Sequence, residues 1–557
     1  MDSRKVRQFR EVRVYGEGSL GGKGEGLVVI NDCDIPSVEK LPTHILATGF
    51  YDRYTERDRT FGEEENDVLD TILHSLGNGP IGVRSSATDE GGVPTGSDWS
   101  IRAGENISFM LPNNHEDRDV RLRQLGLAVR AVYDHFLAKQ DEGDRDAKMA
   151  VVLNPVPGLF DDTLAGPFFY PYISGVANSY FPYALKTQDP TEGFARIAFG
   201  HGYATVMDDF PVISMATIRT PVSIELLRPG EGQQYFYALD MTRNRELKGR
   251  ELETMAKLHV RFASFHKIKL LGIRRNVITI EELVQKGHFG FKSGLEGIME
   301  AVSAHIASHF QIEFVFNLDF GKKPHEDGVF HVVQLTRLPE MAFETIRMPE
   351  ESLFRYLTSG SLQGHGIRRG VKHAVVVSPF LYSREQHDEV LARLGSINRD
   401  MRERGEAYLL IVPGRLGSRN REWGICAQYR DVDGAVAIFE YGVDIAGRIE
   451  PLPEKDSMTG GIYGSHFLYM IGGGYDEHQR RLQARMYGTQ GTHFLTNLMS
   501  NNVIYGYLNP GVDTLDAWFF SPPAGAGPIY VLTFTDPVAV YADSVSQCCV
   551  VTPDTDA

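Results

Sequence analysis

The sequence is poor in cysteine, has no long apolar run and shows no excess of positive charge, and each absence excludes a class of protein. Four cysteines in 557 residues cannot form a disulfide scaffold. No two of them have the C-x-x-C spacing, so a structural zinc site built on thiolates is not expected. No run of 18 apolar residues occurs, so no segment is expected to span a membrane. The arginine-rich N-terminal segment lacks the apolar core of a signal peptide, and the cytoplasm is the expected compartment.

The charge balance argues against general binding to nucleic acid or to anionic membranes. Lysine and arginine number 57 against 73 aspartates and glutamates, which gives a net charge of −16. An acidic chain lacks the electrostatic attraction on which such binding depends. The motifs of serine hydrolases with a nucleophile elbow, of zinc proteases and of EF-hands are absent as well. A local basic pocket for a phosphate group remains compatible with this balance.

What is present is a globular composition with both helical and strand periodicity. Hydrophobic residues make up 42% of the chain and charged residues 23%, an ordinary balance for a protein of about three to five domains or subdomains. Apolar residues at spacings of three and four predict helices, and short or alternating apolar runs predict strands. The predicted helices are Leu122–Phe136, Leu295–Ile306 and about Glu385–Arg404, and the predicted strands are Met149–Leu153, Ile312–Leu318, Val329–Leu335, Ala374–Val377 and Tyr408–Val412.

The last third of the chain is expected to be a separate α/β domain. A boundary is predicted after Pro339, around residues 341–370, because a new block of alternating strands and a helix follows. The stretch from Ser521 is rich in proline, glycine and alanine and then acidic. That composition predicts one or two strands and a frayed tail.

A glycine-rich segment, Gly16–Gly26, follows a short β-like run near the N-terminus. Glycines let backbone N–H groups approach phosphate oxygens, and Lys23 adds a positive charge. The spacing Gly16-x-Gly18-x-x-Gly21 fits a dinucleotide-binding fingerprint, whereas a P-loop is excluded because Gly24 stands where serine or threonine is required. Two further interpretations are a flexible loop that covers phosphate through Lys23 and a plain turn at a strand end.

The run Ile81–Glu90 is a second candidate for anion binding. A predicted strand delivers Arg84, whose planar fork suits phosphate oxygens. The hydroxyls that follow, beginning with Ser85, could complete the shell around a phosphate, and two carboxylates close the run. The alternative is a solvated strand end with a capping serine.

The third candidate is a predicted hairpin of residues 312–319 and 328–335. If Asp319 lies opposite Gly328, a regular antiparallel ladder places Glu313 opposite Gln334, with their Cβ atoms about 4.5–5.5 Å apart on one face. A carboxylate and an amide oxygen at that separation can share a hard cation such as Mg²⁺, and Asn317 on the same face could assist. The alternative is a polar pair on a solvent-exposed face.

These segments resemble the nucleotide-binding domain of phosphoenolpyruvate synthases and pyruvate phosphate dikinases. The resemblance runs in the family's order from about residue 10 to residue 340, and several independent motifs support it. The motifs are Leu20–Gly24, Val83–Glu90, Ala103–Asn113, Ala128–Tyr133, Ile173–Ala177, Glu192–Ala198, the strand with Glu313 and the strand with Gln334–Arg337.

The resemblance implies an α+β architecture. Residues 1–345 would form an ATP-grasp nucleotide-binding domain of two subdomains, with ATP and Mg²⁺ between them. Residues 346–557 would form the C-terminal α/β domain, which resembles the tail of large proteins with the same ATP domain, a likeness that names no reaction.

The resemblance also implies roles for individual residues. Lys23 and Arg84 match the family's phosphate contacts, and Glu313 and Gln334 match its metal-side residues. The run Met149–Asn154, including Met149 and Val151, corresponds to the strand and hinge that line the adenine pocket of the family.

The sequence departs from the family in several places. Gln311 stands where the family usually has an acidic residue, which leaves one carboxylate fewer for the metal ion. The hinge reads Asn154-Pro155-Val156-Pro157 instead of Gln-x-Met-Val, and the Gln-x-Arg-Pro motif has an extra residue on each side of Arg337. The phosphohistidine domain and the pyruvate-binding barrel of the dikinases are not found, so synthesis of phosphoenolpyruvate by this chain alone is not expected.

Two features of the C-terminal part could serve a phosphoryl acceptor. Pro413-Gly414-Arg415 could hold an anionic group, or it could form a tight turn with a surface arginine. His466 and His493 could each accept a phosphoryl group, because a neutral imidazole is a nucleophile near pH 7. The alternative is a structural histidine packed beside phenylalanine. His493 is the preferred candidate, because the neighbouring Thr492 can hydrogen-bond a phosphoryl oxygen.

Together these features predict an ATP- and Mg²⁺-dependent phosphotransferase of dikinase type. Its first two thirds would bind and cleave ATP, and its last third would position the acceptor, which is its own histidine, a small molecule or a protein. One alternative is an ATP-grasp ligase that forms an acyl phosphate. Another is a nucleotide-binding regulator without turnover, which Gln311 favours. Neither nucleic acid nor a membrane is an expected partner.

Overall fold

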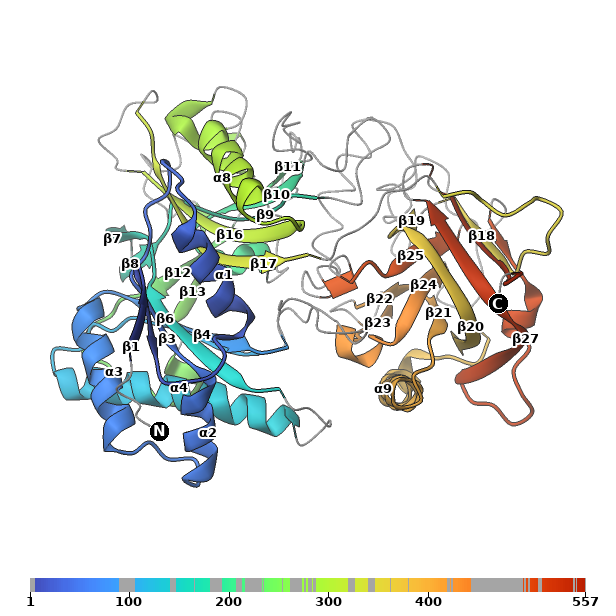
Figure 1. The fold of residues 1–557 in the computed structure, drawn as a ribbon, viewed down its shortest axis with the longest axis horizontal. Coiled ribbons are helices and arrows are strands. Elements are labelled where there is room, and N and C mark those ends of the chain that lie inside the picture. Colours follow the sequence, from blue (N-terminus) through green and yellow to red (C-terminus); the bar gives the residue numbers. More distant parts are fainter. Residues whose placement is uncertain are drawn as a thin grey trace. The chain divides into compact units, whose positions relative to one another are not determined.

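The chain is a mixed α+β protein with several sheets (Figure 1). The structure is a computed structural model, and the chain divides into two compact units. The first unit comprises Met1–Tyr180 and Thr191–Leu338, and the second comprises Phe181–Pro190 and Pro339–Ala557. The residues that the structure describes are 6–89, 106–140, 147–164, 166–180, 193–206, 213–215, 233, 235–252, 254–260, 273–274, 277–278, 283, 287–318, 326–338, 346–360, 362–378, 380–417, 421, 424–441, 494, 497–498, 501–508, 513–543, 546 and 548–555.

Sheet A of the first unit has six strands in the order β1-β2-β3-β6-β4-β5. Strands β2 and β3 pair parallel, and the other neighbours pair antiparallel. The strand predicted at Met149–Leu153 is β6, and it is central in this sheet. The strands are β1 Val6–Phe9, β2 Val12–Tyr15, β3 Thr43–Leu46, β4 Ile81–Ala87, β5 Ser108–Leu111 and β6 Met149–Pro155.

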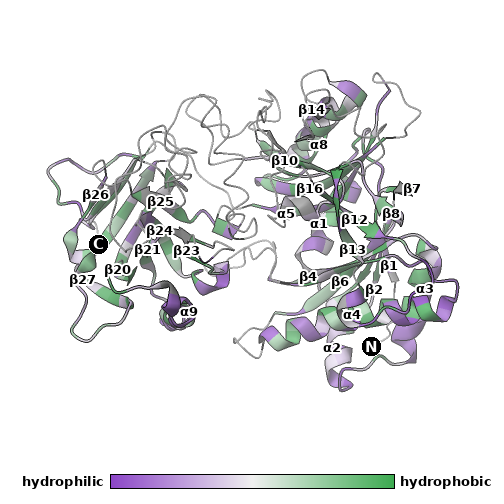
Figure 2. Cartoon of the chain, turned by 180° about the vertical axis from the view of Figure 1, so that it is seen from behind, coloured by the Kyte–Doolittle hydropathy of each residue, from purple (hydrophilic) through white to green (hydrophobic). Residues whose placement is uncertain are grey.

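Three helices cover one face of sheet A. Their apolar residues share a core with Val83 of β4 and Val151 of β6. The longest of them confirms the helix predicted at Leu122–Phe136, and Figure 2 shows hydrophobic and hydrophilic residues alternating along it. The three are α2 Thr48–Glu56, α3 Glu63–Leu76 and α4 Arg118–Gln140.

Sheet B of the first unit has five antiparallel strands in the order β11-β10-β9-β16-β17. One face packs against α8, which confirms the helix predicted at Leu295–Ile306. Strands β16 and β17 confirm the two strands of the predicted hairpin. The elements are β9 Ile173–Asn178, β10 Phe194–Phe199, β11 Ile213–Met215, β16 Phe310–Asn317, β17 Val329–Arg337 and α8 Phe291–His305.

The remaining described elements of the first unit are short. Sheet C has the strand order β13-β12-β8-β7, and β14 and β15 form a separate pair. The bounds are β7 Leu159–Leu164, β8 Gly166–Tyr170, β12 Tyr235–Asp240, β13 Met255–His259, β14 Ile273–Arg274, β15 Val277–Ile278, α5 Tyr203–Val206, and the 3-10 turns η2 Gly249–Leu252 and η4 His288–Gly290.

Helix α1 (Gly21–Asp32) is shared by sheets A and B. Its Leu27 packs against Ile45 of β3 and Val152 of β6, on the face of sheet A opposite the three helices. The same helix lies against β17 of sheet B, and a Cβ atom at Gly26 would come within 2.1 Å of the Leu335 carbonyl oxygen. Glycine at position 26 is therefore required for the backbones of α1 and β17 to approach each other.

Replacing Gly26 by alanine is expected to lower the free energy of unfolding by about 2–3 kcal/mol, because the added methyl group overpacks a backbone contact. Gly297 in α8 is the matched control, since no atom lies within 4 Å of a Cβ placed there. Gly297→Ala should instead stabilise the protein by up to about 1 kcal/mol through helix propensity. Urea unfolding of both variants checks this, and equal effects at the two positions would contradict the close approach.

His44 in sheet A predicts a pH dependence of stability. Its side chain is 1% exposed, and its Nδ1 lies 3.0 Å from the Tyr15 hydroxyl. Burial, with the nearby charge of Arg13, lowers the pKa of His44 from 6.5 to about 4. Below pH 6.5, His44 therefore becomes protonated in the unfolded chain but stays neutral in the folded chain. The stability that neutral His44 contributes is complete above pH 6.5 and is lost as the pH falls towards 4.

Between pH 7.5 and pH 5 this loss should amount to about 2 kcal/mol for His44. His44→Gln cannot titrate, so its urea stability should fall less than that of the wild-type protein over the same range. Other buried histidines titrate in both proteins and cancel in the difference. Parallel pH profiles of the two proteins would show that His44 is not the group responsible.

The second unit is built on a nine-stranded mixed sheet in the order β19-β25-β24-β21-β20-β27-β28-β18-β26. Strands β20, β21, β24 and β25 are parallel, and α9 connects β20 to β21. The predicted strands at Ala374–Val377 and Tyr408–Val412 and the predicted helix between them are confirmed. The bounds are β18 Leu357–Ser359, β19 Leu362–Gln363, β20 Gly366–Val377, β21 Tyr408–Pro413, β22 Arg415–Leu416, β23 Gly424–Ile425, β24 Ala435–Tyr441, β25 Ile504–Leu508, β26 Thr514–Leu515, α9 His387–Glu403, η5 Arg384–Gln386, η6 Tyr429–Asp431 and η7 Ala517–Phe520.

The one or two strands predicted after Ser521 are confirmed, whereas the frayed tail is wrong for the described residues up to Pro553, which are paired in a sheet. Strand β27 (Ile529–Asp543) lies between β20 and β28 inside the sheet, and β28 (Cys548–Pro553) pairs along it. Pro537 falls where the register between β20 and β27 is irregular, which is where the interior of a strand tolerates proline. Among the described residues, no helix combines the length and the apolarity needed to cross a membrane.

Candidate functional site

Strand β16 has one apolar face and one polar face. Phe310, Ile312, Phe314 and Phe316 are at most 1% exposed and pack in the core with α8. Because side chains alternate along a strand, the residues between them point the other way. Glu313 is the charged residue on that second face, and its side chain is 28% exposed. Sheet B therefore offers a polar face on the side away from α8.

A β-bulge in β17 brings Gln334 to this polar face. Ile312 pairs with Leu335 and Glu313 with Gln334, but Phe314 pairs with Val332, so Val333 is the extra residue. A regular ladder continued from the turn would have placed Gln334 opposite Ile312, on the apolar face. The predicted pairing of Glu313 with Gln334 is confirmed, whereas the regular register assumed for it is wrong.

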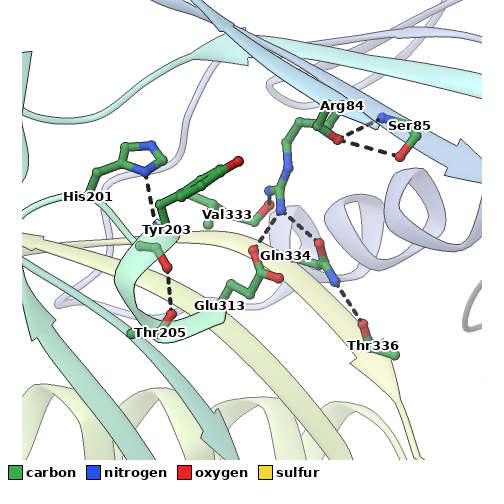
Figure 3. Close-up of polar contacts among 11 residues, drawn as sticks. Arg84, Ser85, His201, Tyr203, Thr205, Glu313, Val333, Gln334 and Thr336 are labelled. Carbon is green, nitrogen blue, oxygen red and sulfur yellow. Dashed lines mark hydrogen bonds and ion pairs between the residues drawn. The ribbon is translucent and has the colours of Figure 1, made fainter. Parts of the chain in front are cut away.

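Arg84 joins the two sheets at this point. It comes from β4 of sheet A, and its Nη2 donates to Glu313 Oε2 at 2.6 Å and to Gln334 Oε1 at 2.8 Å. Its Nη1 donates to the Val333 carbonyl oxygen, which the bulge leaves available, at 2.5 Å. Figure 3 shows the guanidinium reaching these groups from above sheet B. Glu313 and Gln334 follow Arg84 by 229 and 250 positions in the sequence. Three residues predicted to bind phosphate or metal are thus in contact.

Ser85 does not share the face of Arg84, which corrects its predicted role in phosphate binding. It is 1% exposed, and it pairs with Val151, which lies in the core between sheet A and the three helices. The next residue, Ser86, returns to the side of Arg84. Its Oγ donates to the Leu20 carbonyl and accepts from the Gly24 N–H, so it anchors the first turn of α1.

Met149 and Val151 are corrected for the same reason. Both are 0% exposed and lie in the core between sheet A and the three helices, where they pair with Ala87 and Ser85. A residue in that position cannot line a nucleotide pocket on the side of Arg84. The alternation of β6 assigns that side to the even-numbered residues, such as Val152, which pairs directly with Arg84.

The glycine-rich segment is a turn followed by a helix. Gly16, Gly18 and Gly21 have φ values of +80°, +100° and +67°, which favour glycine. Hydroxyl groups of the protein accept hydrogen bonds from three of the segment's N–H groups: Ser19 N–H donates to Thr48, Gly21 N–H to Ser19 and Gly24 N–H to Ser86. These contacts favour the turn over a phosphate-cradling loop.

Lys23 lies in the first turn of α1 rather than in a loop. Its side chain is half-buried. It precedes Gly26 by three residues, and residues at this spacing project from the same side of a helix. Lys23 therefore projects from the side of α1 that meets β17, where Gln334 lies.

His201 and Tyr203 adjoin the cluster and were missed by the sequence interpretation. His201 N–H donates to the Tyr237 carbonyl, and its Nδ1 accepts from the Tyr203 N–H at 3.2 Å. Burial and the charge of Arg84 lower the pKa of His201 to about 4, against the opposing effect of Glu313. The ring is thus neutral at pH 7 with its proton on Nε2. Glycines on both sides of a histidine just after a strand were the available signal.

The other polar residues of this face are engaged elsewhere. Gln311 Nε2 donates to Asn178 Oδ1 at 2.8 Å, and Asn317 Oδ1 accepts from the Tyr172 N–H at 3.2 Å. Neither contact involves Arg84. Across the part of the chain that the structure describes, no group of three or more His, Cys, Asp or Glu side chains is placed to hold a metal ion.

Glu313 and Gln334 nevertheless fit a hard cation that takes its remaining ligands from water and phosphate. Their oxygens converge on one donor nitrogen of a positively charged group, Nη2 of Arg84, at 2.6 and 2.8 Å. Mg²⁺ binds such carboxylate and carbonyl oxygens and commonly keeps several waters beside one or two protein ligands. The pair can therefore supply part of a magnesium site.

His466 and His493, the predicted phosphoryl acceptors, lie outside the described residues. Phe494, which follows His493 in the sequence, is described: it is 4% exposed and packs against Gly417. In the Pro413-Gly414-Arg415 segment, Gly414 has a φ of +66° between β21 and β22.

A search against models of known protein families finds none that matches the chain, and a search of curated proteins finds no match either. The resemblance to the dikinase nucleotide-binding domain therefore stays a prediction from the sequence motifs.

Proposed function

We propose that the first unit binds ATP with Mg²⁺ and that the protein is a phosphotransferase of dikinase type. The observation that supports this most is the contact of Arg84 with Glu313 and Gln334. Arg84 of sheet A is suited to bind phosphate, and Glu313 and Gln334 of sheet B are suited to bind a metal ion. The three are remote in the sequence and meet on a polar face. A purely structural ion pair does not require an amide and a carboxylate to converge on the same guanidinium.

Each residue has a distinct task in this proposal. Arg84 supplies a planar fork for phosphate oxygens, and Lys23 supplies a second positive charge. Glu313 and Gln334 hold the metal ion, which offsets the negative charge of the transferring phosphoryl group. His201 adds an uncharged N–H donor near Arg84. The second unit would position the acceptor of the phosphoryl group.

A second candidate is a nucleotide-binding regulator without turnover. Gln311 favours it, because this residue stands where a second carboxylate would be expected and its amide is hydrogen-bonded to Asn178. With a single carboxylate, the site carries less negative charge for a metal ion than a site with two.

Following ATP and Mg²⁺ with the full chain by ³¹P NMR separates these possibilities. AMP together with phosphate supports the dikinase type, and ADP supports a ligase or a simple kinase. Binding without consumption supports the regulator. A wild-type protein that does not bind nucleotide at millimolar concentration would overturn both candidates.

A further inference from the structure

We propose that the guanidinium of Arg84 and a divalent cation are alternative occupants of one oxygen seat. The seat is formed by Glu313 Oε2, Gln334 Oε1 and the main-chain carbonyl oxygen of Val333. This inference deepens the proposed function and rests on it for the part that concerns nucleotide. It adds the Val333 carbonyl oxygen to the ligands of the metal ion and predicts the order in which nucleotide and cation bind.

All three oxygens accept from the guanidinium of Arg84. Glu313 Oε2 and Gln334 Oε1 lie 2.6 and 2.8 Å from Nη2, and the Val333 oxygen lies 2.5 Å from Nη1. The carbonyl of Val333 is available because the bulge makes Val333 the unpaired residue of the ladder between β16 and β17. Carboxylate, amide and main-chain carbonyl oxygens are also the ligand types that bind hard divalent cations in proteins. A set of oxygens that binds a guanidinium is therefore chemically suited to a hydrated cation.

The Arg84 guanidinium and the cation cannot occupy the seat together, because both are positively charged. The seat brings one formal negative charge, from Glu313, and two neutral oxygens. A guanidinium and a divalent cation within about 4 Å of each other would repel strongly where water is partly excluded. The Arg84 side chain is 11% exposed, so little water screens it. Glu313 is 28% exposed, which leaves the seat accessible to an incoming ion.

Because the two cannot occupy the seat together, nucleotide and cation are expected to bind in a fixed order. Without nucleotide, Arg84 fills the seat and links sheet A to sheet B. A phosphate group offers the guanidinium another bidentate partner, and its departure frees the three oxygens for the cation. Cation and nucleotide should therefore bind with strong positive cooperativity, and the cation alone should bind weakly.

The test is the binding of Mn²⁺ to the full chain without nucleotide, followed by electron paramagnetic resonance. Arg84→Gln should bind Mn²⁺ about tenfold more tightly than the wild type, because the competing charge is gone. Arg118→Gln is the matched control: it removes an arginine whose ion pair with Asp70 is exposed elsewhere in the same unit, and its Mn²⁺ binding should not change. Adding Glu313→Gln to Arg84→Gln should abolish the gain.

The third oxygen has its own readout. The sequence contains two Val–Gln peptide bonds, at positions 284–285 and 333–334. Labelling valine with ¹³C at the carbonyl and glutamine with ¹⁵N isolates these two NMR signals. In the Arg84→Gln variant, diamagnetic Mg²⁺ should shift the carbonyl ¹³C signal of Val333, because its oxygen becomes a ligand of the cation. A Val333 carbonyl signal that stays in place while Mg²⁺ saturates this variant would remove Val333 from the seat.

The outcomes separate this inference from the proposed function. If the wild type binds Mg²⁺ with ATP but Arg84→Gln gains no Mn²⁺ affinity, the exclusion is refuted and the proposed function stands. If Arg84→Gln gains affinity but the wild type binds no nucleotide, the seat stands and the proposed function fails. Should Arg84→Gln not fold, Arg84→Met also removes the charge and keeps a long side chain, and a similar gain is expected from it. No gain in a folded Arg84→Met protein would overturn the inference.

Discussion

Replacing Glu313 by glutamine is expected to raise the Mg²⁺ concentration needed for half-maximal nucleotide binding by about a hundredfold, because it removes a metal-ligating carboxylate while keeping the side chain's shape. Glu313 is the charged member of the pair that faces Arg84, and Gln334 can supply only a neutral oxygen. Titrating Mg²⁺ at a fixed concentration of a non-hydrolysable ATP analogue measures the change.

Glu296→Gln is the control for this experiment. Glu296 lies on α8 in the same unit and faces Lys292 at 3.7 Å, with its side chain 29% exposed. The substitution removes the same charge at a distance from Arg84, so its Mg²⁺ requirement should match that of the wild type. If Glu313→Gln also matches the wild type, the metal ion is bound elsewhere.

Deleting Val333 is expected to weaken nucleotide binding with Mg²⁺ by about tenfold while the protein remains folded. The deletion removes the extra residue of the bulge, so Val332 stays opposite Phe314 and Gln334 stays opposite Glu313 in a regular ladder. What is lost is the Val333 carbonyl oxygen, which accepts from Arg84 Nη1 at 2.5 Å without nucleotide and would become a ligand of the cation when nucleotide binds. Losing one of the cation's three protein oxygens accounts for an effect of about tenfold.

Val333→Ala provides the comparison, because it keeps the carbonyl and trims a half-buried side chain. Calorimetric titration of both variants distinguishes the main chain from the side chain. A deletion variant that binds as tightly as Val333→Ala would show that the bulge matters only for packing.

The strongly periodic elements could be predicted from the sequence, and so could the partners of the central contact. The helix around Leu122–Phe136 and the strand around Glu313 follow from spacing alone. The pairing of Glu313 with Gln334 was also predicted, but from a regular register. The sequence does not indicate whether Val332 or its neighbour Val333 is unpaired, so the bulge at Val333 could not be predicted.

The errors around Arg84 have one physical origin. Motif comparison treats Arg84 and Ser85 as neighbours, but successive side chains of a strand point to opposite faces. Ser85 therefore lies in the helix-covered core, together with Met149 and Val151 of the adjacent strand. The alternation around Arg84 was enough to exclude Ser85, and it would have pointed to Ser86 instead.

The glycine pattern was ambiguous for a different reason. Glycine permits a backbone to approach either a phosphate or another backbone. Gly26 serves the second purpose, against Leu335 of β17. That contact joins residues more than three hundred positions apart, and a single sequence carries no sign of it. The position of β27 between β20 and β28 was hidden in the same way.

The most direct measurement is a calorimetric titration of the full chain with a non-hydrolysable ATP analogue, with and without Mg²⁺. Binding that strengthens with Mg²⁺ is expected for the wild-type protein, and Arg84→Gln should lose the part of the affinity that depends on the phosphates. No heat of binding at millimolar nucleotide, in the presence of Mg²⁺, would contradict nucleotide recognition by the Arg84–Glu313–Gln334 cluster.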